Sequence, residues 1–184
     1  MNYQAKKYLL ICLTLGCLNL GAYAAPKDFH NGKYLPEYGL IASIEADMVI
    51  PKGTTFKVAF DAAKVAEPGA LNSTLNSTAR FLNMHHEAGV PSETMQLAIV
   101  FHGSATFDIT NDDAYSEKFD TPEIANAALI QALIDKNVRI ILCGQSATHH
   151  NVKKDDLLPG VEMALSAMTA HALLQQYGYT LNPF

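Results

Sequence analysis

One cysteine, Cys143, is the residue whose type and position in this sequence most clearly allow chemistry. It ends the apolar run 139–142 and is followed at once by Gly144, Gln145 and Ser146. Such a run predicts a buried strand. In an open α/β sheet, the edge where a strand gives way to a loop is where ligands bind. A thiol at that edge could act as a nucleophile, because the thiolate is the reactive form of cysteine.

The residues after Cys143 could hold its sulfur as an anion. Backbone N–H groups of a turn at Gly144, Gln145 and Ser146 could point at the sulfur, and the Gln145 amide and Ser146 hydroxyl could add donors. Gly144 has no Cβ and would let the backbone approach closely. His149, in the loop expected next, could supply a positive charge or a proton.

Two more residues are candidates for supporting roles at the same sheet edge. His102 follows a second apolar run, 95–101, and Tyr115 lies in the polar stretch after it. Each candidate also has a structural interpretation. Cys143 could be an inert core thiol, since free cysteine is among the most buried residue types. His102 could be a hydrogen-bonded structural histidine, and Tyr115 could serve packing.

Metal and cofactor sites have little support in this sequence. The chain has seven histidines, including adjacent pairs at 85–86 and 149–150. Their spacing from one another and from Cys143 does not match the usual zinc signatures. A phosphate-binding glycine motif, a Ser-His-Asp order and a paired-carboxylate signature are also missing. We therefore expect no metal ligand and no cofactor.

The N-terminus predicts export. Residues 1–25 have the pattern of a secretory signal peptide, with Lys6 and Lys7 before an apolar stretch and a small-x-small sequence at 22–24. The apolar stretch is rather short for the roughly 20 residues that span a bilayer, so we expect cleavage and no later membrane contact. A lipid-modified Cys17 is the alternative. Export implies an oxidising compartment, for which we expect a bacterial periplasm.

Cleavage would also simplify the cysteine chemistry. Cys12 and Cys17 both lie in the predicted signal peptide, so Cys143 would be the one thiol of the mature chain. Loss of Lys6 and Lys7 would leave 11 basic against 18 acidic residues, a net charge of −7. This balance opposes binding to a phosphate backbone, so we expect no nucleic acid partner.

The pattern along the chain predicts one α/β domain after an N-terminal extension at 26–53. Order is expected from about residue 38 onward. Apolar runs predict strands at 55–60, 95–101 and 138–143, a short one at 161–164 and a last one at 179–184. Helices are expected at 70–88, from Asp120 or Thr121 as cap to Asn137, and from Ser166 as cap to Gly178, with Met168, Ala172 and Leu173 on the apolar side of the last. This alternation implies a three-layer α/β/α fold, flavodoxin-like, with a mostly parallel sheet of about five strands.

The order of several motifs resembles the DsrE/DsrF-like family over roughly residues 54–184. The segment 138–146 carries the resemblance most clearly, followed by 156–161 and by the tail from Ala164 to Ala170. Upstream, His102-Gly103 and the stretch 113–115 also fit. The resemblance implies a small α/β/α (DsrEFH-like) fold that assembles into homo-oligomers or hetero-oligomers.

Sulfur-relay members of that family carry sulfur as a persulfide on a cysteine just after a central strand, which is the kind of position that Cys143 occupies. This chain differs from them in its predicted export and in the Gly-Gln-Ser that follows its cysteine. Together with the predicted export, the resemblance implies a periplasmic sulfur-binding or sulfur-transfer protein that carries a persulfide on Cys143. Its expected partner is a sulfur donor or acceptor, which is a protein or a small sulfur compound. We expect a homo-oligomer. The alternative is a non-catalytic module that binds a small ligand or a partner and has a structural Cys143.

Overall fold

A computed structural model of the chain describes residues 28–119 and 125–183, and its centre is one parallel sheet. The strands are β3 (Phe56–Ala62), β4 (Met95–Phe101), β5 (Arg139–Cys143), β6 (Glu162–Ala164) and β7 (Thr180–Asn182). Their order is β6-β5-β4-β3-β7, and every pairing is parallel. The predicted sheet and all five of its strands are confirmed.

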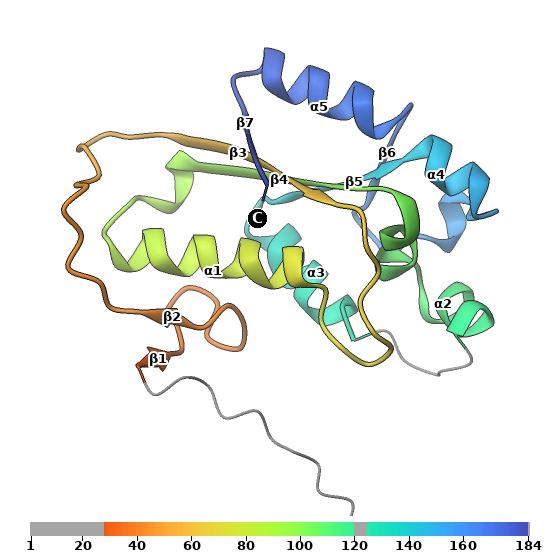
Figure 1. Cartoon of the computed structure of the whole chain (residues 1–184), viewed down its shortest axis with the longest axis horizontal. Coiled ribbons are helices and arrows are strands. Elements are labelled where there is room, and N and C mark those ends of the chain that lie inside the picture. The colour runs from red at the N-terminus through yellow and green to blue at the C-terminus, as the bar shows by residue number, and fades with distance from the viewer. Residues whose placement is uncertain (1–27, 120–124, 184) are drawn as a thin grey trace, which may run out of the picture.

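Helices cover both faces of this sheet, which confirms the three-layer α/β/α prediction (Figure 1). The helices α1 (Ser73–Glu87) and α3 (Ala127–Asp135) lie on one face, and α5 (Ala167–Gln176) lies on the other. Side chains alternate along each strand. On β3, Val58 and Phe60 therefore enter the larger core under α1 and α3, whereas Ala59 faces α5.

Helix starts follow local capping chemistry. The Asn72 side chain accepts from the Thr74 N–H at 2.9 Å and begins α1. Ser166 begins α5 as predicted, because its hydroxyl accepts from the Thr169 N–H at 3.0 Å. Asp120 and Thr121, the predicted caps of α3, lie outside the described residues, and α3 itself begins at Ala127.

Two segments that were expected to be irregular are helical instead. Residues 144–146, predicted as a turn, form the first half of α4 (Gly144–His149), with Cys143 as the residue before the helix. The polar stretch at 111–115 enters α2 (Asp112–Phe119), since the Asn111 side chain accepts from the Ala114 N–H at 3.0 Å. Short 3₁₀ turns complete the chain: η1 (Ser92–Thr94), η2 (Gly103–Ile109) and η3 (Lys154–Asp156).

The described part of the N-terminal extension packs against α1. Strands β1 (Phe29–His30) and β2 (Ile41–Ala42) pair antiparallel. Asn83 of α1 fixes the loop between them, accepting from the Leu35 N–H at 2.8 Å and donating to carbonyls of that loop. The expectation of disorder before residue 38 is therefore wrong for residues 28–38. The predicted signal peptide lies outside the described residues, and among those described no helix has the length and apolar character to span a bilayer.

Candidate functional site

Cys143 lies where β5 passes into α4, and its side chain faces the start of α5. It pairs in register with Ala164 of β6, whose chain turns from there into α5. Figure 1 shows the starts of α4 and α5 at the same end of the sheet. Cys143 is buried, with 5% of its surface exposed, and is the free cysteine of the described residues. Its sulfur therefore meets mostly protein atoms rather than water.

The sulfur of Cys143 is surrounded by hydrogen-bond donors. Burial raises the pKa of the Cys143 thiol, because it disfavours the charged form. The Ser146 hydroxyl and the N–H groups of Ser146, Ala167 and Gln145 lie around the sulfur, and together they outweigh burial and lower the pKa below that of an ordinary cysteine. Ala167 is the first residue of α5, so its N–H also carries the positive end of that helix dipole. This environment favours a thiolate.

The Ser146 hydroxyl is itself oriented from a neighbouring strand. It accepts from the Gly103 N–H at 3.0 Å, and this bond leaves its own hydrogen free to stabilise a charge on the Cys143 sulfur. Gly103 has the left-handed φ of 55°, and a Cβ there would lie 2.9 Å from the Ala63 carbonyl oxygen. Gly103, the first residue of η2 after β4, therefore helps to fix the position of the Ser146 hydroxyl.

Two neighbours of Cys143 hold the segments around it together. A Cβ on Gly144 would lie 2.7 Å from the Ala164 carbonyl oxygen, so a glycine lets α4 start close against β6. The Gln145 side chain donates to the Leu165 carbonyl oxygen at 3.2 Å. The expectation that this side-chain amide donates to the sulfur is wrong, because the amide is used to fix the loop before α5, and the Gln145 backbone N–H meets the sulfur instead.

His102 lies beside Cys143 and belongs to a cluster that sequence reasoning missed. Its Nε2 is 3.0 Å from Oδ2 of Asp61, and Nε2 of His171 is 2.8 Å from Oδ1 of the same carboxylate. Burial raises the pKa of Asp61, but the hydrogen bonds and charges of the two histidines outweigh it and hold that pKa below its ordinary value. The polar group at this end of the sheet is therefore an Asp61 carboxylate with an imidazole on each oxygen.

A correct prediction of the buried face of α5 would have placed His171 near the sheet. The residues of α5 that face the sheet are Ala170 and Leu174, with His171 next to them, whereas the predicted apolar-side residue Met168 is 80% exposed. The predicted apolar side of this helix is therefore wrong. Asp61 was harder to find from the sequence. It is an acidic residue two positions after Ala59, whose side chain faces α5.

His149 and Tyr115 are not brought to this site. His149 ends α4, is exposed, and lines a different hollow together with Phe107 and His150. Tyr115 is 2% exposed and packs against Phe119 in the core on the other face of the sheet, where burial raises its pKa. Neither side chain meets the sulfur, because α4 carries His149 away along its axis and Tyr115 faces the opposite layer.

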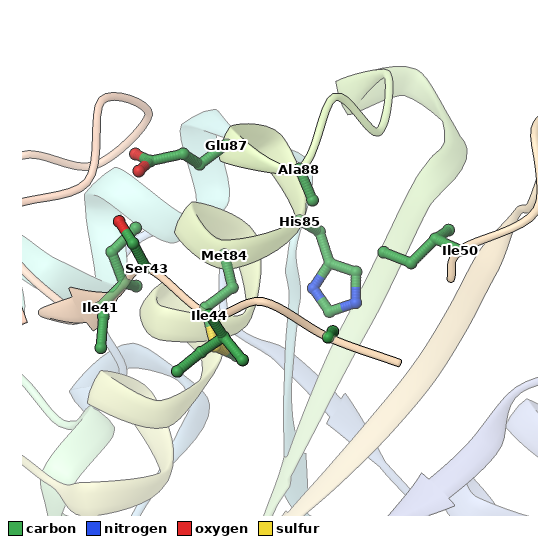
Figure 2. A pocket seen from close by; sticks show the side chains of 10 residues that line it. Ile41, Ser43, Ile44, Ile50, Met84, His85, Glu87 and Ala88 are labelled. Atoms are coloured by element: carbon green, nitrogen blue, oxygen red, sulfur yellow. The ribbon is translucent and has the colours of Figure 1, made fainter. Parts of the chain in front are cut away.

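A pocket lined mainly by apolar side chains is also separate from Cys143. It lies between the segment after β2 and the end of α1, and Figure 2 shows Ile44, Ile50, Met84 and His85 turned toward it. In the described residues no cluster of three metal-binding side chains has the geometry to hold an ion. The chemistry that this arrangement supports is therefore that of a thiolate with hydrogen-bond donors and a nearby pair of histidines.

Comparison with known proteins shows which family and fold this chain is similar to. The DsrE/DsrF-like family matches residues 57–183. The ychN protein from E. coli is 15% identical, with a TM-score of 0.52 over 71% of this chain and 100% of its own. A protein of unknown function from Methanobacterium thermoautotrophicum is also 15% identical, with a TM-score of 0.51 over 70% of this chain and 99% of its own. These two structures share the fold. No curated protein matches by sequence.

Proposed function

Because the chain belongs to the DsrE/DsrF-like family, we propose that it binds or transfers sulfur, carrying sulfane sulfur as a persulfide on Cys143. One observation carries the proposal: Cys143 lies where β5 passes into α4 and faces the start of α5, and the polar groups of these two helix starts lower the pKa of its thiol. Such an environment is typical of reactive cysteines and not of core thiols, which have raised pKa values. The donors also suit a persulfide, whose outer sulfur is an anion when ionised.

The proposed cycle has two steps of the same kind. The Cys143 thiolate attacks the outer sulfur of a donor, a sulfur–sulfur bond of the donor breaks, and the leaving group departs with the electron pair. Cys143 then holds the sulfur as a persulfide. In the second step an acceptor thiolate attacks the outer sulfur, and Cys143 leaves as the thiolate. Neither step needs an external oxidant or reductant.

The site of action and the partners complete the proposal. The signal-like segment at 1–25 supports a periplasmic protein. A donor or acceptor protein, or a small sulfur compound, would meet Cys143 from the side of the loop before α5. That side carries exposed apolar residues on β6 and α5, including Met163, Leu165 and Met168. We propose that a second copy of the chain covers part of this surface, since β6 is an edge strand with an open side.

The 5% exposure of Cys143 favours a second candidate, a binding module in which this thiol is structural. The two are separated by treating the purified protein with polysulfide or thiosulfate and measuring its intact mass. The sulfur-carrier proposal predicts a gain of one sulfur atom, localised to Cys143 by peptide mapping and missing from Cys143→Ser. A wild-type protein that gains no sulfur under any donor supports the binding module and rejects the carrier.

A further inference from the structure

The cluster at Asp61 joins three elements of the fold through one carboxylate. Asp61 comes from β3, His102 follows β4, and His171 lies in α5. Both histidines use Nε2 to bond the carboxylate, at 3.0 Å and 2.8 Å. Each Nε2–H therefore donates to Asp61, which fixes the tautomer and leaves Nδ1 of each ring as the proton acceptor. An imidazole held in this way can take up and release a proton at Nδ1.

The register of the sheet places the backbone of His102 beside that of Cys143, while the Nε2 of its ring contacts Asp61 on the other neighbouring strand. Phe101 pairs with Leu142, so the next residues on the two strands, His102 and Cys143, lie side by side. The residues two positions earlier, Val100 and Ile141, both pack against α5. Since side chains alternate, His102 and Cys143 face α5 as well, on strands about 5 Å apart. The backbone of His102 is still extended, which preserves this placement.

The cluster also contains an atom whose hydrogen bonding is incomplete. Nδ1 of His171 is buried and has no partner among the described residues. Buried polar atoms without partners are uncommon and call for an explanation. The titratable groups around His102 are Asp61 from β3, which its ring contacts, His171 from α5, which bonds the same carboxylate, and Cys143 at the neighbouring position of β5. An unfilled acceptor position in such a group is consistent with a site that handles a proton.

The proposed sulfur transfer needs a proton that the donors around Cys143 cannot supply. Backbone N–H groups and the Ser146 hydroxyl stabilise the thiolate, but at neutral pH they do not release their hydrogens. A leaving thiolate whose conjugate thiol has a pKa near ~8.5 ends mostly as the thiol at neutral pH, and protonating it as the sulfur–sulfur bond breaks lowers the barrier. In the second step the acceptor thiol must lose its proton. One group with an acid form and a base form near neutral pH serves both steps, and histidine is such a group.

We infer that His102 carries this proton, and that Asp61 and His171 are positioning residues that hold its ring for the task. With a thiol persulfide as donor, the Cys143 thiolate bonds to the outer sulfur of R–S–S⁻. The sulfur–sulfur bond breaks toward R–S⁻, which takes the proton of the His102 imidazolium and leaves as R–SH. Cys143 then holds –S–S⁻ and His102 is neutral. The second step runs in reverse with an acceptor thiol, whose proton returns to His102.

This inference rests on the proposed function, and its test uses reagents that differ in their need for a proton. The full chain and its His102→Gln variant are mixed with glutathione persulfide, with thiosulfate and with iodoacetamide over a range of pH. Iodide and sulfite leave without a proton. We expect the variant to take sulfur from glutathione persulfide about a hundredfold more slowly. Its pH profile should also lack the limb that reports the imidazolium. Its rates with iodoacetamide and thiosulfate should stay within about threefold of wild type.

Two further variants guard against a change in folding. Asp61→Asn should slow the persulfide reaction less than His102→Gln and shift the same limb of the profile, because the ring remains but its partner is lost. His149→Gln, which alters an exposed histidine of α4, should behave as wild type. Equal slowing of His102→Gln with all three reagents, or a wild-type persulfide profile in that variant, would overturn the inference alone. A wild type that takes sulfur from no donor would overturn the proposed function and this inference with it.

Discussion

The hydroxyl of Ser146 offers the sharpest test of how the protein holds the Cys143 sulfur. This hydroxyl accepts from the Gly103 N–H at 3.0 Å and lowers the pKa of the Cys143 thiol. A hydrogen bond to a charged group contributes about 1.5–3 kcal/mol, and one pKa unit corresponds to about 1.36 kcal/mol. Ser146→Ala is therefore expected to raise the pKa of the thiol, and at neutral pH to reduce the fraction of thiolate by about ten- to a hundredfold. The shift is limited because the three backbone N–H donors remain.

The rate of alkylation by iodoacetamide, measured against pH, reports this change. Only the thiolate reacts, so at each pH below the wild-type pKa the variant should react about ten- to a hundredfold more slowly than wild type. Above both pKa values the two rates should meet, or the variant should be slightly faster, since a thiolate of higher pKa is more nucleophilic. The pKa is read from the midpoint of each curve.

A matched variant separates ionisation from access. Ser104→Ala removes a hydroxyl in η2 that donates to the Ala63 carbonyl oxygen at 3.3 Å and does not meet the sulfur. Its alkylation curve should follow that of the wild type. If Ser146→Ala lowered the high-pH plateau and left the midpoint in place, the hydroxyl would control access to the thiol and not its charge, and the reasoning would be refuted.

Three other changes test the surroundings of the site. Gly144→Ala would place a Cβ 2.7 Å from the Ala164 carbonyl oxygen, so we expect about 1–3 kcal/mol lower stability in urea unfolding; a neutral effect would contradict the close approach. Asp108→Ala leaves the buried Asn126 and Asn72 amides and the half-buried Ala66 N–H without this acceptor, and we expect a loss of about 2–4 kcal/mol in the same assay. A loss within about 0.5 kcal/mol would refute a stabilising role of the Asp108 carboxylate. The folded pKa of Asp61 lies below its ordinary value, so its contribution to stability is present at neutral pH and lost as pH falls through the folded pKa. Asp61→Asn should therefore show a weaker loss of thermal stability on acidification than wild type, and an identical acid dependence would contradict the ion pairs.

Local sequence patterns predicted the fold well because the strands of a parallel sheet are buried on both faces. Such strands are continuous apolar runs, and the run 95–101 matches β4 residue for residue. The position of Cys143 at the end of β5 follows from the same pattern. The small residue after it was also informative, since Gly144 is required by the contact with the carbonyl of Ala164.

The parts of the site that depend on distant pairing could not be read from the sequence. Asp61 and His171 are 110 positions apart along the chain, and only the packing of α5 on the sheet joins them. The Ala167 N–H reaches the sulfur for the same reason. The apolar pattern of α5 is also ambiguous. Met168 is apolar but exposed, and the face that this helix buries carries Ala170 and Leu174 instead. His149 failed as a candidate because the turn expected after Cys143 is a helix.

Return of sulfur from Cys143 to an acceptor is the step that tests the account most directly. Protein loaded with one sulfur atom is freed of donor, mixed with an excess of a small thiol, and followed by intact mass and by detection of the acceptor persulfide. The account predicts that the extra mass leaves the protein, that an equal amount of acceptor persulfide forms, and that Cys143 becomes ready to load again. Sulfur that stays on the protein, or never enters it while the thiol can still be alkylated, would contradict a carrier role.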